Sequence, residues 1–427
     1  MIKILQVRNV DSFVESRRQK TSEKDRKTVQ VILNDVRKNG DSAVKKYERK
    51  FNGRKTSQLR VSAKEIKEAR SKISSEERNA IDDVRFAMFA RSGLRLMDRL
   101  YNYKDTISKA NGVTQSFVPI SSVGCYIPGG QARYPSSTIM SVRPAAKARV
   151  KRIVVVSPPG PDGKIDPLTI AAAKMCGATE IYKIGGAQAI GALAYGTKSI
   201  PKVDKIVGPG GKFVSIAKSL VSDQTAIDMV AGPTELGIIA DASSDPELVA
   251  LDLISQAEHS KDTMCFVITQ SKTMAKQIQK SVEKLILGTE RSSIIKASIS
   301  KNGFIAICKN QNQMVELANK IAPEHMELMV KNAKSLSKKI TGAGLVLIGK
   351  NTPSAVSDYF LGTNHILPTG GFGRTRGGLS VLDFLKPQTM VVGLDKLDLG
   401  YFDRYQEVLT DAEGLPNHYK AVKRRLD

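Results

Sequence analysis

The residues best suited to chemistry in this chain are its four histidines, which are few and unevenly placed. They occur in the stretches SQAEHS, APEHMEL, GTNHILPT and EGLPNHYK, as His259, His325, His365 and His418. All have carboxylate or amide neighbours, and none lies in the first half of the 427 residues. Imidazole beside such groups suits proton transfer near neutral pH or the binding of Zn²⁺ or a similar divalent ion.

Two of these stretches place a histidine next to a candidate functional partner in ways that leave alternatives open. Gln256 and His259 are three residues apart at the end of an expected helix, so they share a face and could ligate one metal. A capped helix end would explain the same pair without a metal. Glu324 and His325 follow Pro323, which disfavours helix just before it, so the pair is expected to open a new element. They could serve as general base and proton acceptor, or as a capping glutamate beside a surface histidine.

The other two histidines lie in the C-terminal part of the chain. Asp358 and His365 follow the expected strand GLVLIG, which predicts a position at a strand's carboxyl end, where open α/β sheets bind ligands. Glu413 and His418 lie near the C-terminus, where they have little expected structural use. Together, these groups predict a catalytic metal site that leaves positions open for substrate.

The composition predicts a cytoplasmic globular enzyme of more than one domain. The hydrophobic content is 41% and the charged content 25%, and no apolar run approaches the roughly 20 residues needed to span a bilayer. The four cysteines form no CxxC pair and are expected to be buried, reduced thiols. The net charge of +24 does not predict a nucleic-acid-binding protein, because the signs are mixed, tryptophan is absent and aromatic residues are only 5%.

The order of expected elements predicts an α/β protein. Residues 1–119 are expected to form an N-terminal helical segment that packs with the second α/β unit, with Ser22 as a helix N-cap and a break at Gly40. Short β-branched strands alternating with helices then predict parallel sheets in a first unit, 120–234, and in a second unit, 235–378, which carries most of the candidate metal-binding and catalytic residues. Residues 379–427 are expected to form a C-terminal helical arm.

The chain resembles the histidinol dehydrogenase family over nearly its whole length. The resemblance is carried, in order, by VGCYIPGG, GGAQAIGALAYGT, AGPTEL, DLISQAEHS, APEHMEL, DYFLGTNHILPT, GGLSVLDF and AEGLPNHYKAV. It implies two incomplete Rossmann-like parallel-sheet units and oxidation of L-histidinol to L-histidine, the last steps of histidine biosynthesis, by two hydride transfers to NAD⁺ with a bound Zn²⁺. It also implies a homodimer that exchanges the C-terminal arm and shares active sites.

The resemblance also implies a role for individual residues. The zinc ligands fall on Gln256, His259, Asp358 and His418, and the catalytic pair on Glu324 and His325. Substrate contacts fall on Thr234, His365 and Glu413, and the four ligands and His325 also face the substrate. The NAD contacts fall on Tyr126, Gln188 and position 211.

Two positions depart from the family pattern. Thr234 stands where the family usually has serine and keeps the hydroxyl, whereas Gly211 stands where it usually has asparagine and loses an amide toward NAD. Lys212 is a candidate to compensate for this loss. The stretch GGAQAIGALA follows a strand and opens a helix, so its N-terminus could face a pyrophosphate, although it lacks the GxGxxG spacing.

A related zinc- and NAD-dependent dehydrogenase acting on another small alcohol is the alternative function. Such an enzyme should lose the positions that recognise imidazole and carboxylate, and this chain keeps His365, Glu413 and His418. Histidinol is therefore the favoured substrate.

Overall fold

The computed structural model describes residues 1–17, 22–53, 58–88, 113–129, 133–230, 232–391 and 396–426. The chain divides into two compact units. The first, which we call the body, comprises Met1–Leu94 and Ile120–Phe384. The second comprises Arg95–Pro119 and Leu385–Asp427. Among the described residues, no helix is both long and apolar enough to cross a membrane.

The first sheet of the body is entirely parallel, with strand order β5-β4-β3-β6-β7. Its strands are β3 (Ser122–Tyr126), β4 (Arg152–Ser157), β5 (Glu180–Lys183), β6 (Lys205–Val207) and β7 (Ala226–Ile227). The helices of this part are α6 (Pro135–Lys147), α7 (Pro167–Cys176), α8 (Gly186–Tyr195) and α9 (Lys212–Val221). The β-branched runs read as strands in the sequence are therefore β3 to β6, and they are buried as central parallel strands should be.

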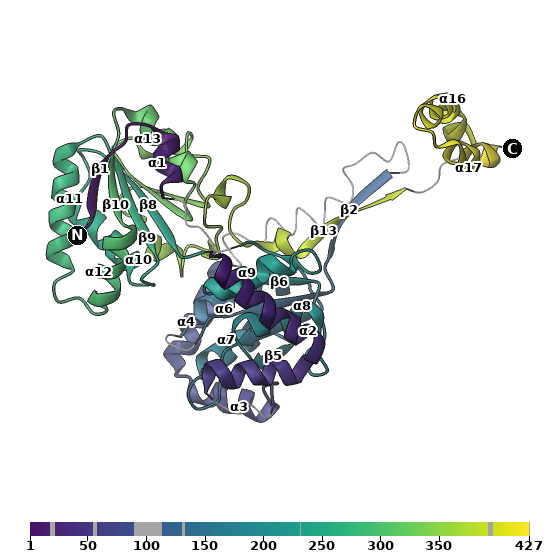
Figure 1. The fold of residues 1–427 in the computed structure, drawn as a ribbon, viewed down its shortest axis with the longest axis horizontal. Coiled ribbons are helices and arrows are strands. Elements are labelled where there is room, and N and C mark those ends of the chain that lie inside the picture. The colour runs from purple at the N-terminus through teal and green to yellow at the C-terminus, as the bar shows by residue number, and fades with distance from the viewer. Residues whose placement is uncertain are drawn as a thin grey trace. The chain divides into compact units, whose positions relative to one another are not determined.

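The second sheet of the body is also parallel, with strand order β1-β10-β9-β8-β11-β12 (Figure 1). Its strands are β1 (Lys3–Gln6), β8 (Glu235–Ala240), β9 (Met264–Thr269), β10 (Phe304–Ile307), β11 (His325–Met329) and β12 (Leu345–Ile348). Its helices are α1 (Val10–Glu15), α10 (Pro246–Ala257), α11 (Lys272–Leu285), α12 (Ser292–Asn302), α13 (Gln311–Ile321), α14 (Ala333–Ser337) and α15 (Ser354–Ser357), and the 3₁₀ helices η4 (Phe372–Arg374) and η5 (Val381–Phe384) follow. Successive residues such as Ile238 and Ile239 enter different apolar clusters, so the core lies on both faces.

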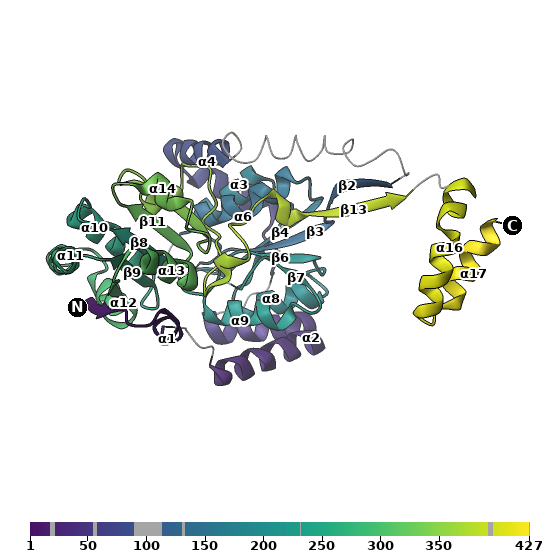
Figure 2. The same ribbon diagram turned by 90° about the horizontal axis from the view of Figure 1, so that it is seen from above.

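The N-terminal segment was predicted to be one helical segment that packs on the second α/β unit, but the structure divides it between the two sheets of the body. Its first strand, β1, and α1 do join the second sheet and α13. However, three helices pack against the helices of the first sheet: α2 (Glu23–Asn52), α3 (Ala63–Lys72) and α4 (Ser75–Ala87). Figure 2 shows α2 along α8 and α9. The reason is an apolar stripe on α2, which shares one core cluster with α8. The predicted N-cap at Ser22 and the break at Gly40, where φ is 51°, are both found.

The second compact unit, Arg95–Pro119 with Leu385–Asp427, consists in its described residues of a β-ribbon and two helices. Strands β2 (Val113–Pro119) and β13 (Leu385–Val391) pair antiparallel, so the prediction that residues 379–427 form a helical arm missed β13. Helices α16 (Lys396–Ala412) and α17 (Pro416–Leu426) pack on each other, and we call this pair the arm. The predicted fold class, two incomplete Rossmann-like parallel-sheet units with an N-terminal helical segment and a C-terminal helical arm, is confirmed. All four cysteines are free and buried, as predicted.

Candidate active site

The candidate catalytic residues lie at the amino ends of two adjacent strands of the second sheet. Strand β8 begins at Glu235 and β11 begins at His325, and the register pairs His325 with Leu236. Helix α13 ends at Ile321 and is followed by the C-cap Ala322, which has a left-handed backbone with φ 51°. Pro323 then leads into β11. This conformation costs roughly 1–2 kcal/mol for a residue with a side chain. The body therefore maintains local strain at the point that aims Glu324 and His325.

Glu324 is a buried carboxyl group with a single fixed donor. Its Oε2 accepts a hydrogen bond of 3.0 Å from the backbone N–H of Glu235. Burial raises the pKa of Glu324 well above its ordinary value, and the nearby charges of Glu235 and Asp358 raise it further. A carboxyl group in this state is a stronger base than an exposed glutamate, so it can exchange a proton near neutral pH.

His325 lies between two carboxyl groups and has both ring nitrogens available. Its Nδ1 is 4.0 Å from Oε2 of Glu324, and its Nε2 is 3.9 Å from Oδ1 of Asp358. Neither nitrogen has a hydrogen-bond partner among the described residues. Burial lowers the pKa of His325 to about 3, so the ring is neutral and can accept a proton.

His365 joins the two sheets of the body at this site. Its Nδ1 lies 3.9 Å from Oδ1 of Asp358 and 3.3 Å from the Asp358 carbonyl oxygen. Its Nε2 lies 3.0 Å from Oγ of Ser137, in the first turn of α6, which follows strand β3. Burial lowers the pKa of His365 to about 4. The carboxyl end of the first sheet therefore meets the amino end of the second at this histidine.

Asp358 and His365 are placed differently from the prediction. They were expected at a strand's carboxyl end, but Asp358 lies beside His325, the first residue of β11. The short helix α15 and the loop after it carry the chain from the end of β12 back to the amino edge of the sheet. The strand-order rule failed because the segment is long enough to reverse before its functional residues begin.

Three of the four predicted metal ligands come from the body. Gln256 is buried near the end of α10, donates its amide N–H to Oγ of Ser354 at 2.9 Å, and leaves Oε1 without a partner. Oδ1 of Asp358 is likewise buried without a hydrogen-bond partner, and burial raises the pKa of this carboxyl to about 7. His259 is more exposed, yet protein atoms around its ring lower its pKa, and its charge in turn would lower the pKa of His325 and His365. These residues are brought together with the catalytic pair.

The remaining predicted residues of the metal and substrate sites are not all in the body. Thr234 directly precedes β8, beside the Glu235 that binds Glu324. Glu413 and His418 lie in the arm, where both are exposed. Within the described part of the chain, no three His, Cys, Asp or Glu side chains are arranged to hold a metal ion.

The predicted cofactor residues lie at the carboxyl ends of the first sheet. Tyr126 ends β3 and Gln188 lies in the first turn of α8, after β5. Gly211 is the N-cap of α9, after β6, with an ordinary φ of −63° and no atom within 4 Å of where a Cβ would lie. Nothing in the local structure requires glycine at position 211. Lys212 forms an ion pair with Asp25 of α2, so its charge is already partnered.

Several buried acids near the site were missed by sequence reasoning. Glu235 accepts the Gly370 N–H at 3.0 Å, and burial raises its pKa to about 7. Glu327, two residues after His325, accepts the Ser354 N–H at 2.6 Å, and its pKa is raised by burial and by the charge of Asp252. A carboxylate inside a run of strand residues, as in HMELM, is the signal that identifies Glu327.

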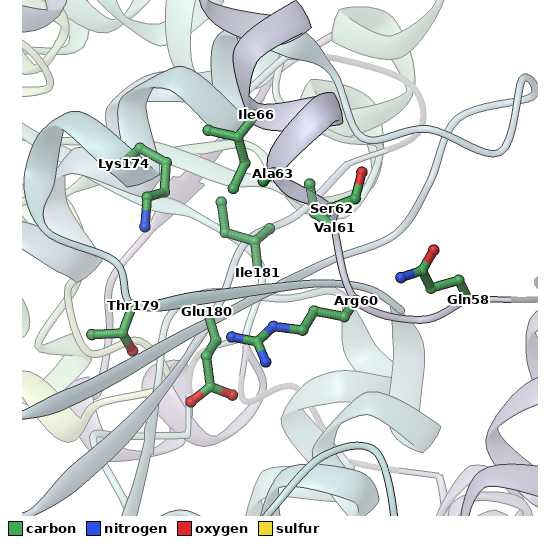
Figure 3. Close-up of a pocket in the computed structure, with 10 residues that line it drawn as sticks. All are labelled: Gln58, Arg60, Val61, Ser62, Ala63, Ile66, Lys174, Thr179, Glu180 and Ile181. Atoms are coloured by element: carbon green, nitrogen blue, oxygen red, sulfur yellow. The ribbon is translucent and has the colours of Figure 1, made fainter.

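A separate cavity of about 340 Å³ lies at the outer edge of the first sheet, and none of the predicted site residues lines it (Figure 3). Residues 59–61 run beside β5 there, with Val61 N–H bonded to the Ile181 carbonyl at 2.9 Å. Arg60 lies beside Glu180, and Lys174 approaches from α7 (Figure 3). This cavity borders the segment that covers a sheet edge.

Comparison with known proteins identifies the same family throughout the chain. The sequence profile described as Histidinol dehydrogenase matches residues 15–426. Histidinol dehydrogenase from Methanococcus maripaludis is 42% identical over 401 residues, covering 94% of this chain and 93% of the relative. The Pelagibacter ubique protein of that name is 38% identical, covering 100% and 99%. The crystal structure of histidinol dehydrogenase from Elizabethkingia anophelis is 32% identical with a TM-score of 0.89, covering 100% of this chain and 98% of that one.

Proposed function

Because the chain belongs to the histidinol dehydrogenase family and is therefore an oxidoreductase, we propose that it oxidises L-histidinol to L-histidine through histidinaldehyde, with NAD⁺ and Zn²⁺. Each turnover would consume one water and two NAD⁺, and would yield two NADH, one carboxylate and three protons. When bound, NAD⁺ supplies the hydride acceptor and Zn²⁺ supplies an anchor for the imidazole and amine of the substrate.

His325 is the proposed base for the alcohol. Its burial keeps the ring neutral, and both of its nitrogens lack partners among the described residues, so one can accept the hydroxyl proton. Oδ1 of Asp358, 3.9 Å from Nε2, stabilises the imidazolium that forms. The same arrangement serves the hydrated aldehyde, which must also lose a hydroxyl proton before its hydride leaves.

Glu324 is the proposed base for the water that hydrates the aldehyde. Its raised pKa makes it a stronger base than an exposed glutamate, and the hydrogen bond from the Glu235 N–H holds one carboxyl oxygen in place. The second oxygen remains for water. Adjacent positions at one strand end thus place the two bases in reach of a single substrate carbon.

The buried donor atoms of the body support the metal assignment. Gln256 Oε1 and Asp358 Oδ1 are each buried acceptors without hydrogen-bond partners among the described residues, a costly state unless a cation or a donor binds them. Ser354 holds the amide N–H of Gln256, which leaves the oxygen as the group that can ligate. His259 would supply a nitrogen ligand, and amide, carboxylate and imidazole together suit Zn²⁺.

The fourth proposed ligand, His418, supports a homodimer with shared active sites. Helix α16 of the arm exposes an apolar face at helical spacing, made by Tyr401, Tyr405, Val408 and Leu409. The body exposes an apolar surface around the metal-binding residues, made by Leu248, Leu251, Val356, Tyr359 and Phe360. We propose that the arm of a second copy covers this surface and delivers Glu413 and His418 to the site.

The observation that carries the proposal is the buried Glu324–His325 pair beside Asp358 in a chain of this family. The test is NADH formation from L-histidinol, with the final amounts of NADH and L-histidine measured after complete conversion. We expect two NADH for each histidine and loss of activity on chelation that added Zn²⁺ reverses. Equal activity on simple diols, or one NADH per histidinol, would contradict it.

A further inference from the structure

The N-terminus of α8 carries a buried carboxylate where a dinucleotide-binding unit would carry phosphate. In such units, the helix after the glycine-rich turn directs its first N–H groups at the pyrophosphate. Here, Oε1 of Glu48, a fully buried residue of α2, accepts the Gly185 N–H at 2.9 Å. A phosphate at this position would meet the volume that the Glu48 carboxyl group already fills.

The same carboxylate fixes the orientation of a predicted cofactor residue. Nε2 of Gln188 donates to Oε1 of Glu48 at 2.8 Å. Because a carboxylate can only accept, the Gln188 amide must present its N–H₂ to Glu48. Its oxygen is buried and has no hydrogen-bond partner among the described residues. That oxygen is the acceptor of the amide that remains for a ligand.

The surrounding turn is built to keep this arrangement. A Cβ on Gly186 would lie 2.8 Å from Oε1 of Gln188, so a larger residue would displace the amide. The Gly186 N–H is bonded to the Tyr126 hydroxyl at 3.1 Å. Burial raises the pKa of Tyr126 to about 12, so its hydroxyl keeps its proton. Two N–H groups at this end of α8 are thus already bonded within the protein.

We propose that Glu48 is a positioning residue of the cofactor site, which replaces phosphate at the N-terminus of α8 and aims the Gln188 amide oxygen at a hydrogen-bond donor of NAD. The pyrophosphate of NAD therefore binds elsewhere than at this helix end. The inference rests on the proposed NAD dependence of the enzyme. It deepens that proposal, because it assigns a role in the cofactor site to Glu48. In the sequence, Glu48 looks like one more charged residue on a helix face.

The main test compares Glu48→Gln with Asp204→Asn in the full-length enzyme. Asp204 also accepts one backbone N–H and one side-chain donor, both from Ser122, but at the amino edge of the same sheet. We expect Glu48→Gln to weaken NADH binding, measured by fluorescence titration without histidinol, and to raise the KM for NAD⁺ about tenfold, because the charge-assisted bond to Gln188 is lost. The kcat and the KM for histidinol should change less than twofold. Asp204→Asn should leave NADH binding unchanged.

A charge swap keeps the proposal testable if Glu48→Gln folds poorly. Gln188→Glu alone sets two carboxylates against each other, whereas Glu48→Gln with Gln188→Glu restores one donor and one acceptor. We expect the double variant to bind NADH at least about threefold more tightly than Gln188→Glu alone. NADH affinity of Glu48→Gln within twofold of wild type, or a double variant no better than the single one, would overturn the inference. A wild-type enzyme that binds no NADH would instead contradict the proposed function.

Discussion

The body and the arm hold their functional side chains in opposite ways. In the body, Glu324 and His325 are buried, and backbone hydrogen bonds and neighbouring acids fix their positions. In the arm, Glu413 and His418 are exposed, on helices whose apolar side chains are also exposed. Under the proposed function, the body would be organised for proton transfer before any ligand binds, whereas the arm residues would need a surface to hold them in place.

The two sheets of the body differ as well. The first sheet presents Tyr126 and the turn before α8 at its carboxyl ends, as open α/β sheets usually do. The second presents Glu235 and His325 at its amino ends. The contact between Ser137 and His365 joins these edges. If NAD⁺ binds as proposed, the hydride acceptor and the substrate would approach from different sheets.

The largest expected effect comes from removing one metal ligand from either region. His259→Ala in the body and His418→Ala in the arm should each lose bound Zn²⁺ and lower activity by roughly 10³-fold, since the anchor contributes several kcal/mol. Metal content by mass spectrometry and NADH formation are the measurements, with Asp262→Asn as an exposed neighbour control. Full metal content in His418→Ala would remove the arm from the metal site.

The second effect separates the two bases of the body. Glu324→Gln should slow oxidation of histidinaldehyde by about 10²-fold and leave oxidation of histidinol much less affected, because only the aldehyde needs activated water. His325→Asn should slow both steps. Single-turnover NADH formation from each substrate measures them. A Glu324→Gln enzyme impaired only in the first step would reverse the assigned roles.

The third effect is on stability and arises from Glu235. Burial raises its pKa to about 7, so its protonated form is favoured in the folded protein. The contribution of Glu235 to the free energy of unfolding is complete at pH values below the pKa that this group has in the unfolded chain. It is lost as the pH rises to about 7, the pKa in the folded protein. In protein stripped of metal by a chelator, the free energy of unfolding of the wild type should fall between pH 5 and pH 8. In Glu235→Gln this fall should be smaller by about 3 kcal/mol. Urea titrations at both pH values, with Glu247→Gln as the exposed control, check this, and an unchanged pH difference would refute it.

The smallest effect concerns the departure at position 211. Gly211→Asn should be tolerated, since φ is ordinary and the space beyond it is open. Asparagine is also a good N-cap, worth a few tenths of a kcal/mol over glycine for α9. If the amide reaches NAD⁺, the KM for NAD⁺ should fall about twofold to fivefold. A higher KM in steady-state assays would show that glycine is required by this enzyme's cofactor site.

Much of the fold follows from the sequence, because β-branched runs ending in glycine or proline are buried parallel strands in both sheets. The catalytic pair was predicted to open an element after Pro323, and β11 does begin at His325. What could not be predicted depends on tertiary contacts. Glu48 looks like any charged residue of α2 until the fold brings it to α8, and the position of Asp358 depends on a chain reversal that local patterns do not encode.

The central claim, that one active site combines the body of one chain with the arm of another, is tested most directly by complementation. His325→Ala and His418→Ala chains should each be nearly inactive alone. When they are unfolded together and refolded, random pairing makes about half of the dimers hybrid, and each hybrid has one intact site. If the active site is shared between two chains, about a quarter of wild-type activity should be recovered. No recovery in a mixture shown to contain hybrid dimers would contradict the shared site. If each site were built within one chain, every site in a hybrid dimer would carry one of the two substitutions.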